Sequence, residues 1–386
     1  MSIKNLGIIL HGATGRITST QHLRNALIPI IEEGGLNINN NTVMPKILLV
    51  GRNEKRLQEI AKTNNNLKWT TNIDSALTDD SYSIFFDGAA TGQRFNTLIN
   101  AINSGKHIYT EKPVASKVSD GLKLLNQAEA ANIKHGAVED KLYLPGFIKL
   151  ANLIDTGFIG RICSFRLEFG WWVFDGKSTP SQRPSWNYRK STGGGILSDM
   201  HPHWRYVIEN ILGPIRHITS SASTSQPERI DENGKQFLVD VEDSSTTLVE
   251  LENGAHGSIL SSWATRVRRD DLVTFQVDGT KASAVAGLRR CWVQSEQETP
   301  KVTGFDLGRN ANKGKDGLDY LQDWKEISDK SPYINPYRVG WEGFISNVVA
   351  DVPFKSDLRE GIRDLQLAEA SFKSAKEHIW VPLTKI

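Results

Sequence analysis

Three polar residues in two separate segments of the chain have the types that alcohol oxidation requires. Lys112 stands between Glu111 and Pro113 at the end of an apolar stretch, while Asp199 and His203 lie four residues apart much further along. An ammonium can polarise a hydroxyl group and stabilise the alkoxide that forms from it. A histidine can accept the hydroxyl proton near neutral pH, and a carboxylate can orient the histidine or the substrate. Together the three side chains predict proton removal from a hydroxyl group.

The second segment predicts a helix that opens from the glycine run 193–195. Because residues four apart share a helix face, Asp199 and His203 would lie side by side. Pro202 would clash with the carbonyl of Ser198 inside a helix, so we expect the helix to begin near Ser198 or to bend there. The same helix would bury an apolar stripe made of Trp204, Val207, Ile208, Ile211 and Leu212.

Both segments also have simpler or different interpretations. Lys112 alone could be a solvated lysine at a helix start, and only the second segment favours catalysis. The following proline restricts Lys112 to an extended backbone and makes a cis peptide unsurprising. Asp199, His201 and His203 include metal-ligand types, but their i, i+2, i+4 spacing does not place all three on one helix face. We therefore expect no metal.

Alternating apolar strands and amphipathic helices must position these residues in the first 137 residues. Strand-like ranges are 7–10, 46–50, 83–87, 107–110 and 134–137, and helix-like ranges are 20–33, 54–61, 94–103 and 117–130. This alternation predicts an α/β domain of the Rossmann type over residues 1–140, with a doubly wound parallel sheet covered on both faces. The polar stretch 37–45 is interpreted as a surface insertion.

The pattern changes after Gly160 to longer strands with hairpin spacing. The ranges 162–173, 244–251, 255–263 and 272–277 predict an open, mainly antiparallel sheet, and helices are expected at 341–349 and 358–378. Residues 141–386 are therefore expected to form an α+β domain. Its last helix is a candidate to pack back on the first domain.

A glycine-rich turn after the first strand predicts a dinucleotide site. Backbone amides in such a turn can approach a pyrophosphate, whose charge the following helix N-terminus stabilises. A plain tight connection is the alternative, but the strand–helix series favours the cofactor. The expected contacts are Gly12, Thr14, Gly15, Arg16 and Ile17, with Ala90 and Thr91 after the third strand.

Arg52 follows the second strand at the position that distinguishes NAD from NADP. An acidic residue there would bind the ribose hydroxyls of NAD, whereas an arginine can accept a 2′-phosphate. The absence of Asp or Glu from Gly51-Arg52-Asn53 favours NADP. Arg52 could instead stack on the adenine of NAD, so both cofactors remain open.

The composition excludes several classes of function. The net charge of +2, with 39% apolar and 23% charged residues, gives no electrostatic footprint for nucleic acid or a membrane surface. No secretory signal or membrane-length apolar run is present. Cys163 and Cys291 are interpreted as reduced thiols, so the expected location is the cytoplasm. Ten tryptophans are enough to supply apolar platforms for sugar rings as well as core residues.

At Glu111-Lys112-Pro113 and at the glycine run leading to Asp199 and His203, the chain resembles the glucose-fructose oxidoreductase / inositol dehydrogenase (Gfo/Idh/MocA) family. The resemblance implies a Rossmann domain joined to an open sheet that carries substrate and oligomer contacts, and hence a homo-oligomer. It also implies that Lys112, Asp199 and His203 are catalytic and that Glu111 lies near the nicotinamide ribose. By the same resemblance, Trp186 and Arg189 line the site.

Two positions depart from the family pattern. His201 stands where the family usually has glycine, and Tyr206 replaces an aspartate often found three residues after the histidine. Cations and indoles near the motifs suit a sugar carrying an anionic group, although these arginines could equally serve cofactor phosphates or surface ion pairs. The candidates for substrate contact are Lys141, Trp172, Arg183, Trp186, Tyr188, Arg189 and Arg205, together with Asp199 and His203.

Three functions are compatible with these residues. The leading one is hydride transfer between NAD or NADP and a ring hydroxyl of a sugar, glycoside or cyclic polyol. The alternative is a glycoside hydrolase that retains NAD, oxidises its substrate transiently, eliminates the substituent and returns the hydride, as sulfoquinovosidases of this type do. A non-catalytic NAD-sensing regulator is a third possibility, against which Lys112 and His203 argue.

Overall fold

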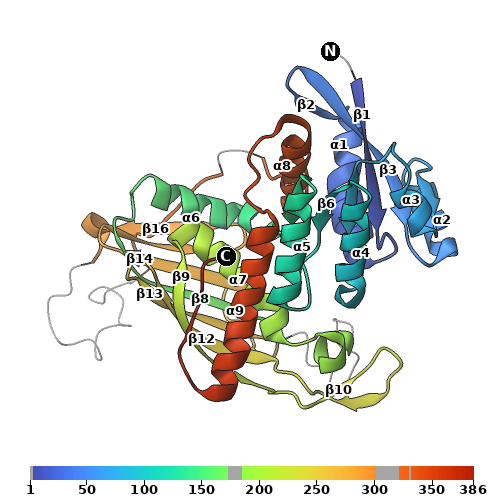
Figure 1. The fold of residues 1–386 in the computed structure, drawn as a ribbon. Helices are drawn as coiled ribbons and strands as arrows, with labels where there is room; N and C mark the ends of the chain where they lie inside the picture. The colour runs from blue at the N-terminus through green and yellow to red at the C-terminus, as the bar shows by residue number, and fades with distance from the viewer. Residues whose placement is uncertain (1–2, 173–184, 301–320, 330–331) are drawn as a thin grey trace.

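The computed structural model describes residues 3–172, 185–300, 321–329 and 332–386, which build two sheets joined by helices (Figure 1). The first sheet has the strand order β2-β3-β1-β5-β6-β7, with β4 also paired to β3. All its pairs are parallel except β2 with β3. The strands are β1 (Ile3–His11), β2 (Leu36–Ile38), β3 (Asn41–Val50), β4 (Lys68–Thr70), β5 (Ile84–Asp87), β6 (His107–Thr110) and β7 (His135–Ala137).

Helices cover both faces of this sheet, as the sequence predicted. Apolar side chains of η1, α1, α2 and α8 form one core with one face, and those of α3, α4, α5 and α9 form a second core with the other. Strands buried on both faces are typical of such doubly wound sheets, and all four residues of β5 are buried. The helices are η1 (Thr18–Leu27), α1 (Ile28–Glu32), α2 (Glu54–Thr63), α3 (Ile73–Leu77), α4 (Thr91–Asn103) and α5 (Val118–Ala130).

The predicted surface insertion at 37–45 is wrong, because these residues are part of the sheet. Leu36 pairs with Val43 and Ile38 with Asn41, so β2 and β3 form a hairpin. Its two-residue loop, Asn39-Asn40, has φ values of 48° and 61°. Asparagine tolerates this left-handed region, which tight hairpin turns require. The strand expected at 46–50 therefore begins at Asn41.

The single helix expected at 20–33 is divided into two. Residues Thr18–Leu27 form a wide π-helix, and the α-helix Ile28–Glu32 continues from it. Pro29, at the start of α1, has no backbone N–H to donate to the preceding turn. A π-helical segment is uncommon and often accompanies a functional site.

The second sheet has nine strands in the order β17-β16-β15-β14-β8-β13-β12-β9-β18. Its pairs are antiparallel apart from β8 with β13, which confirms the expected open, mainly antiparallel sheet. The main strands are β8 (Ile162–Gly170), β9 (Ile215–Ser223), β12 (Ser244–Leu251), β13 (His256–Ser262), β14 (Val273–Gly279), β15 (Ala282–Ala286) and β16 (Cys291–Ser295). The short strands β17 (Lys325–Glu326) and β18 (Val381–Pro382) flank them, and β10 (Glu228–Ile230) pairs with β11 (Gln236–Leu238) in a separate ribbon.

Helices α6 (Pro145–Asp155), α7 (Ile196–Leu212) and α9 (Leu358–Glu377) pack on one face of the nine-stranded sheet (Figure 1). Helix α9 also contacts the first sheet's layer, since a Cβ on Gly121 of α5 would lie 2.8 Å from Ile362. Helix α8 (Pro336–Ala350) contributes Trp341, Phe344 and Ile345 to the core of the first sheet. The C-terminal helices thus join the two sheets. None of the helices in the described ranges is both long and apolar enough to cross a membrane.

Candidate active site

The glycine turn after β1 is closely packed against the turn after β5. Gly12 has a φ of +72°, and a Cβ there would lie 2.7 Å from the backbone of Gly88 and Ala89. A Cβ on Gly88 would lie 2.1 Å from the hydroxyl of Thr18. Only glycine fits this close approach of two turns at the carboxyl edge of the sheet, where α/β proteins bind dinucleotides. The residues present therefore fit a dinucleotide cofactor.

A buried carboxylate holds the loops around this turn. Asp87, at the end of β5, accepts the Nε–H of Arg94 at 2.8 Å and lies 2.6 Å from Nδ1 of His11. Burial alone would raise the pKa of Asp87, but the hydrogen bond with His11 and the charge of Arg94 lower it below its usual value. Arg94 also donates to the carbonyls of Ala89 at 2.6 Å and Pro113 at 2.5 Å. One arginine thereby fixes the loops that follow β5 and β6, and the second of these loops contains the cis peptide between Lys112 and Pro113.

Lys112 and Asp199 are in direct contact. Nζ of Lys112 lies 2.8 Å from Oδ1 of Asp199 and 2.9 Å from its backbone carbonyl. Each side chain keeps 15% of its surface exposed, so the pair remains accessible at the edge of the sheet. Lys112 follows β6 and Asp199 lies in the first turn of α7, so the contact joins the two parts of the molecule.

Helix α7 begins earlier than the sequence suggested. Its first residue is Ile196 rather than a residue near Ser198, and Pro202 lies inside the helix. The main-chain carbonyl of Glu242 accepts the N–H of Ile196 at 3.1 Å, and its side chain accepts the N–H of Leu197 at 3.0 Å. Glu242 thus caps the helix from outside, in the space that a side chain at Gly195 would fill.

His203 lies on α7 one turn after Asp199 and is 7% exposed. Its Nδ1 is 2.7 Å from the hydroxyl of Tyr206, which donates at 3.3 Å to Asp140. Asp140 begins the short helix η2 (Asp140–Tyr143) and accepts Nζ of Lys141 at 2.7 Å. The predicted substrate contact Lys141 is therefore paired with a carboxylate beside the histidine.

Glu111 is oriented by a histidine that the sequence analysis did not single out. Nε2 of His22 lies 2.8 Å from Oε1 of Glu111, and the indole N–H of Trp341 donates to Nδ1 of His22 at 3.0 Å. Since an indole can only donate, Nδ1 must accept and Nε2 must carry the proton that goes to Glu111. Oε2 of Glu111 accepts the backbone N–H of Lys112 at 3.1 Å. Both carboxylate oxygens of Glu111, next to Lys112, are thus held by hydrogen bonds.

Other predicted site residues lie in different surroundings. Trp186 is half exposed, and Arg189 lies 4.0 Å above the ring of Phe237. The guanidinium of Arg266 covers Trp172 at 3.9 Å. Tyr188 is buried in the core of the second sheet, beneath Arg229 at 4.0 Å and edge-on to Trp263. The turn into η1 contains Thr14, Gly15, Arg16 and Ile17, and the start of α4 contains Ala90 and Thr91. Arg52 is exposed after β3. Arg183 lies outside the described residues.

Arg205 was expected to contact the substrate, but its guanidinium is buried against carboxylates of α7 and α9. It lies in a buried ionic cluster, where it contacts Glu360 at 2.7 Å, Asp364 at 3.5 Å and Glu209. Burial raises the pKa of Asp364 above its usual value, even though the charge of Arg205 opposes this shift. The cluster ties α7 to α9. Of the two interpretations of this arginine, the ion pair is the one that the geometry supports.

The three side chains with metal-ligand types, Asp199, His201 and His203, point in different directions. Asp199 contacts Lys112, whereas Nε2 of His201 lies 2.9 Å from the hydroxyl of Thr247 in β12. His201 is fully buried, and burial lowers its pKa to about 3. Within the described ranges, three or more His, Cys, Asp or Glu residues nowhere gather in a group that could hold a metal ion.

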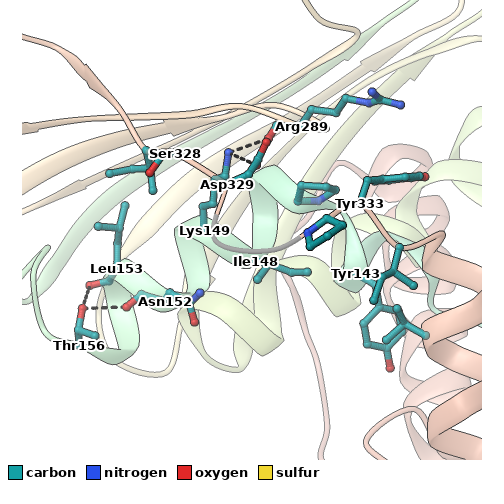
Figure 2. Close-up of a pocket in the computed structure, with 15 residues that line it drawn as sticks. Tyr143, Ile148, Lys149, Asn152, Leu153, Thr156, Arg289, Ser328, Asp329 and Tyr333 are labelled. Atoms are coloured by element: carbon teal, nitrogen blue, oxygen red, sulfur yellow. Dashed lines mark hydrogen bonds and ion pairs between the residues drawn. The ribbon is translucent and has the colours of Figure 1, made fainter.

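A separate cavity of about 510 Å³ lies between α6 and the segment that leads into α8 (Figure 2). Lys149 crosses its wall, with Nζ 2.7 Å from Asp329 and 3.3 Å from the carbonyl of Arg289. Lys112, Asp199 and His203 are not among the residues that line it. This cavity is therefore distinct from the candidate active site.

Asp140, Tyr206, His22 and Trp341 are the functional candidates that the sequence analysis missed or noted only as a departure. A signal existed for Asp140, because Glu139-Asp140-Lys141 follows a buried strand at the sheet edge where ligands bind. No local pattern marks His22 or Trp341, whose contact joins positions 319 residues apart.

Known proteins share both this architecture and the sequence. Residues 147–285 match the family profile described as the GFO/IDH/MocA C-terminal domain. The chain is 40% identical to D-xylose dehydrogenase of Paenarthrobacter nicotinovorans over 385 residues, which cover 98% of this chain and 97% of that protein. Levoglucosan dehydrogenase of Pseudarthrobacter phenanthrenivorans is 31% identical over 208 residues, or 50% of this chain and 52% of that protein.

A solved structure of levoglucosan dehydrogenase in complex with NADH superposes with a TM-score of 0.82 at 19% identity, covering 99% of this chain and 100% of that chain. The complex with NADH and levoglucosan gives a TM-score of 0.80 at 21% identity, with coverage of 99% and 100%. At these identities the likeness shows the fold alone.

The similarity to D-xylose dehydrogenase over 98% of the chain shows that the protein is an oxidoreductase that uses a nicotinamide dinucleotide, and the parallel sheet with its close-packed glycine turns is consistent with this class. The chain belongs to the Gfo/Idh/MocA family, as its full-length similarity to D-xylose dehydrogenase and its C-terminal domain match both show.

Proposed function

We propose that the protein is a dehydrogenase for a neutral sugar, and that Lys112, Asp199 and His203 form its catalytic group. The observation that carries the proposal is the 2.8 Å contact between Nζ of Lys112 and Oδ1 of Asp199, one helical turn from His203. A charged amine and an imidazole held on adjoining elements can act on the same hydroxyl group.

Each side chain has a separate task in this proposal. Lys112 donates to the substrate oxygen and stabilises the negative charge that develops on it. Asp199 holds the ammonium in place through its carboxylate and its backbone carbonyl. His203 takes the hydroxyl proton at Nε2, because Nδ1 is engaged with Tyr206. The bound nicotinamide supplies the hydride acceptor.

We propose a neutral sugar because the cations near the site, within the part of the chain that the structure describes, already have anionic partners or stack on rings. Lys141 is bound to Asp140, and Arg205 is enclosed by Glu209, Glu360 and Asp364. The anionic sugar considered from the sequence therefore loses its support. D-xylose dehydrogenase, at 40% identity, and levoglucosan dehydrogenase are named for neutral sugars, which makes a pentose or an anhydrosugar the proposed substrate class.

We propose NAD as the cofactor, with NADP also accepted. NADH is present in the levoglucosan dehydrogenase complexes of the same fold. Arg52 is exposed after β3 and Asn53 caps α2, so no carboxylate at this position repels a 2′-phosphate.

The direct test mixes the purified protein with NAD⁺ or NADP⁺ and with D-xylose, levoglucosan, glucose 6-phosphate or an aryl xyloside. We expect stoichiometric NADH with a neutral sugar, measured at 340 nm, and a loss of about 10²- to 10³-fold in kcat for Lys112→Ala with cofactor affinity retained. Aglycone release without NADH would instead support the oxidoreductive glycosidase. Tight NAD binding without turnover of any sugar would support the regulator.

We further propose that the protein assembles as a homo-oligomer through the sheet face that α6, α7 and α9 leave uncovered. Leu248 of β12 and Leu260 of β13 are 48% and 37% exposed on neighbouring strands. A monomer in light-scattering measurements at micromolar concentration would contradict this proposal.

The free Cys163 and Cys291 support the reducing compartment that we propose for the protein.

A further inference from the structure

The ring of His203 is held by a chain of hydrogen bonds that leads away from Lys112 and ends on an ion pair. Nδ1 lies 2.7 Å from the hydroxyl of Tyr206. That hydroxyl donates to Oδ1 of Asp140 at 3.3 Å and accepts the backbone N–H of Lys141 at 3.2 Å. The other carboxylate oxygen of Asp140 accepts Nζ of Lys141 at 2.7 Å.

This chain defines which nitrogen of His203 carries the proton. A tyrosine hydroxyl has one proton to donate and two lone pairs that accept. Its proton is directed to Asp140 and one lone pair takes the N–H of Lys141, so the contact with His203 requires Nδ1 to donate. A neutral imidazole with its proton on Nδ1 carries its basic lone pair on Nε2.

We propose that Tyr206 and Asp140 are positioning residues that keep His203 in the Nδ1-protonated form and so make Nε2 the atom that accepts the substrate proton. The inference deepens the proposed function, since it presumes His203 as the base. The O–H bond of the substrate breaks, the new N–H bond forms at Nε2, and no proton leaves Tyr206. The carboxylate of Asp140, 3.8 Å from Nδ1, balances the charge of the imidazolium.

Burial makes the arrangement durable over the working pH range. Tyr206 is fully buried, and burial together with the charge of Asp140 raises the pKa of its hydroxyl well above the usual value. Tyr337 of α8 also hydrogen-bonds to Asp140. Charged and titratable groups from several elements surround His203 and Tyr206. They are Glu139, Asp140 and Lys141 at η2, Asp199 on α7, Tyr337 on α8, Asp364 on α9 and Lys112 after β6.

Nitrogen NMR of the full-length protein labelled with ¹⁵N-histidine tests the tautomer without any turnover. The chain has nine histidines, and the spectrum of His203→Gln identifies the signal of His203. We expect the Nδ1-protonated form in the native protein and a shift toward the Nε2-protonated form in Tyr206→Phe. Tyr82→Phe, which alters another buried tyrosine in the first domain, should leave the signal unchanged.

Kinetics supply the second readout. Tyr206→Phe should lower kcat by about 10- to 100-fold while the KM for sugar and the affinity for NADH stay within about 3-fold, because only the base is misaligned. Asp140→Asn removes the charge that stabilises the imidazolium, so the acid limb of its kcat–pH profile should move to lower pH.

The outcomes separate this inference from the proposed function. If the native protein oxidises no sugar, the proposed function fails, and the NMR spectra still decide the tautomer. An Nε2-protonated His203 in the native protein, or unchanged spectra and kcat in Tyr206→Phe, would overturn the inference. If Tyr206→Phe does not fold, Asp140→Asn supplies the test of the positioning role. Unchanged NMR spectra and an unchanged kcat–pH profile in Asp140→Asn would also overturn the inference.

Discussion

Trp341 donates its indole N–H to Nδ1 of His22 at 3.0 Å, across 319 residues of chain. The contact brings the C-terminal helix α8 against the π-helix η1 and orients the His22 proton toward Glu111. A residue of the second half of the chain thereby controls a carboxylate that the family resemblance places near the nicotinamide ribose. Residues from both halves of the chain thus fix the carboxylate of Glu111.

His22→Ala should weaken NADH binding. Without Nε2–H, Oε1 of Glu111 loses its buried donor, and a lost hydrogen bond to a charged group predicts a Kd increase of about 10-fold. Fluorescence titration with NADH measures the effect. His22→Gln, which restores a donor of similar reach, should recover part of the affinity, and equal affinities in all three proteins would contradict the role.

Gly12→Ala should abolish cofactor binding and destabilise the packing of the first sheet. The new methyl would lie 2.7 Å from the backbone of Gly88 and Ala89, so one of the two turns must move. Gly105 is a matched control, because its φ of +70° is nearly the same as the +72° of Gly12 but no atom lies within 4 Å of a Cβ there. Gly105→Ala should cost only the strain of a positive φ, roughly 1 kcal/mol, and leave NADH affinity unchanged. Thermal unfolding and NADH titration compare the two variants. Retained NADH affinity in Gly12→Ala would show that the close packing of the Gly12 and Gly88 turns is not needed for cofactor binding.

Arg52→Asp should discriminate between the two dinucleotides. A carboxylate at this exposed position would repel a 2′-phosphate and can bind ribose hydroxyls, so use of NADP should fall at least about 10-fold while use of NAD is kept. Ratios of kcat/KM for the two cofactors measure the change. Exchange of Arg56, which pairs with Glu59 on the same helix, should leave the ratio unaltered. An unchanged ratio in Arg52→Asp would show that Arg52 does not reach the 2′ position.

The stability of the protein should depend on pH through His201. This histidine is neutral in the fold, with a pKa lowered by burial from 6.5 to about 3. Its unfolded form binds a proton below pH 6.5, whereas the folded form does not until near pH 3. Stability is therefore fully present above pH 6.5 and is lost as the pH falls through that window.

At pH 5 this loss amounts to about 2 kcal/mol, as 1.36 kcal/mol corresponds to each pKa unit. Urea unfolding of His201→Gln should show lower stability at pH 7.5 but a weaker decline down to pH 5. The exposed His256 is the control, and His256→Gln should keep the native slope. Parallel slopes in His201→Gln and the native protein would contradict a neutral buried His201.

Local patterns in the sequence determined the kinds of element, because side-chain periodicity and turn residues act within a few neighbours. The strands at His107–Thr110 and Ser244–Leu251 were predicted at both ends, and both sheets have the expected character. Prediction was wrong where local polarity was misleading: the polar stretch 37–45 was interpreted as a surface insertion, but its Asn39-Asn40 turn closes a hairpin of the first sheet.

Only the tertiary structure decided which side chains meet. The sequence identified Lys112, Asp199 and His203 as candidates, but their partners follow from packing between distant elements. Tyr206 meets Asp140 across 66 residues, and Arg205, expected to face a substrate, meets Asp364 across 159. A hydrogen bond needs two atoms within about 3 Å, and spacing along the chain determines such distances within one helix or hairpin but not between helices that pack from opposite ends of the chain.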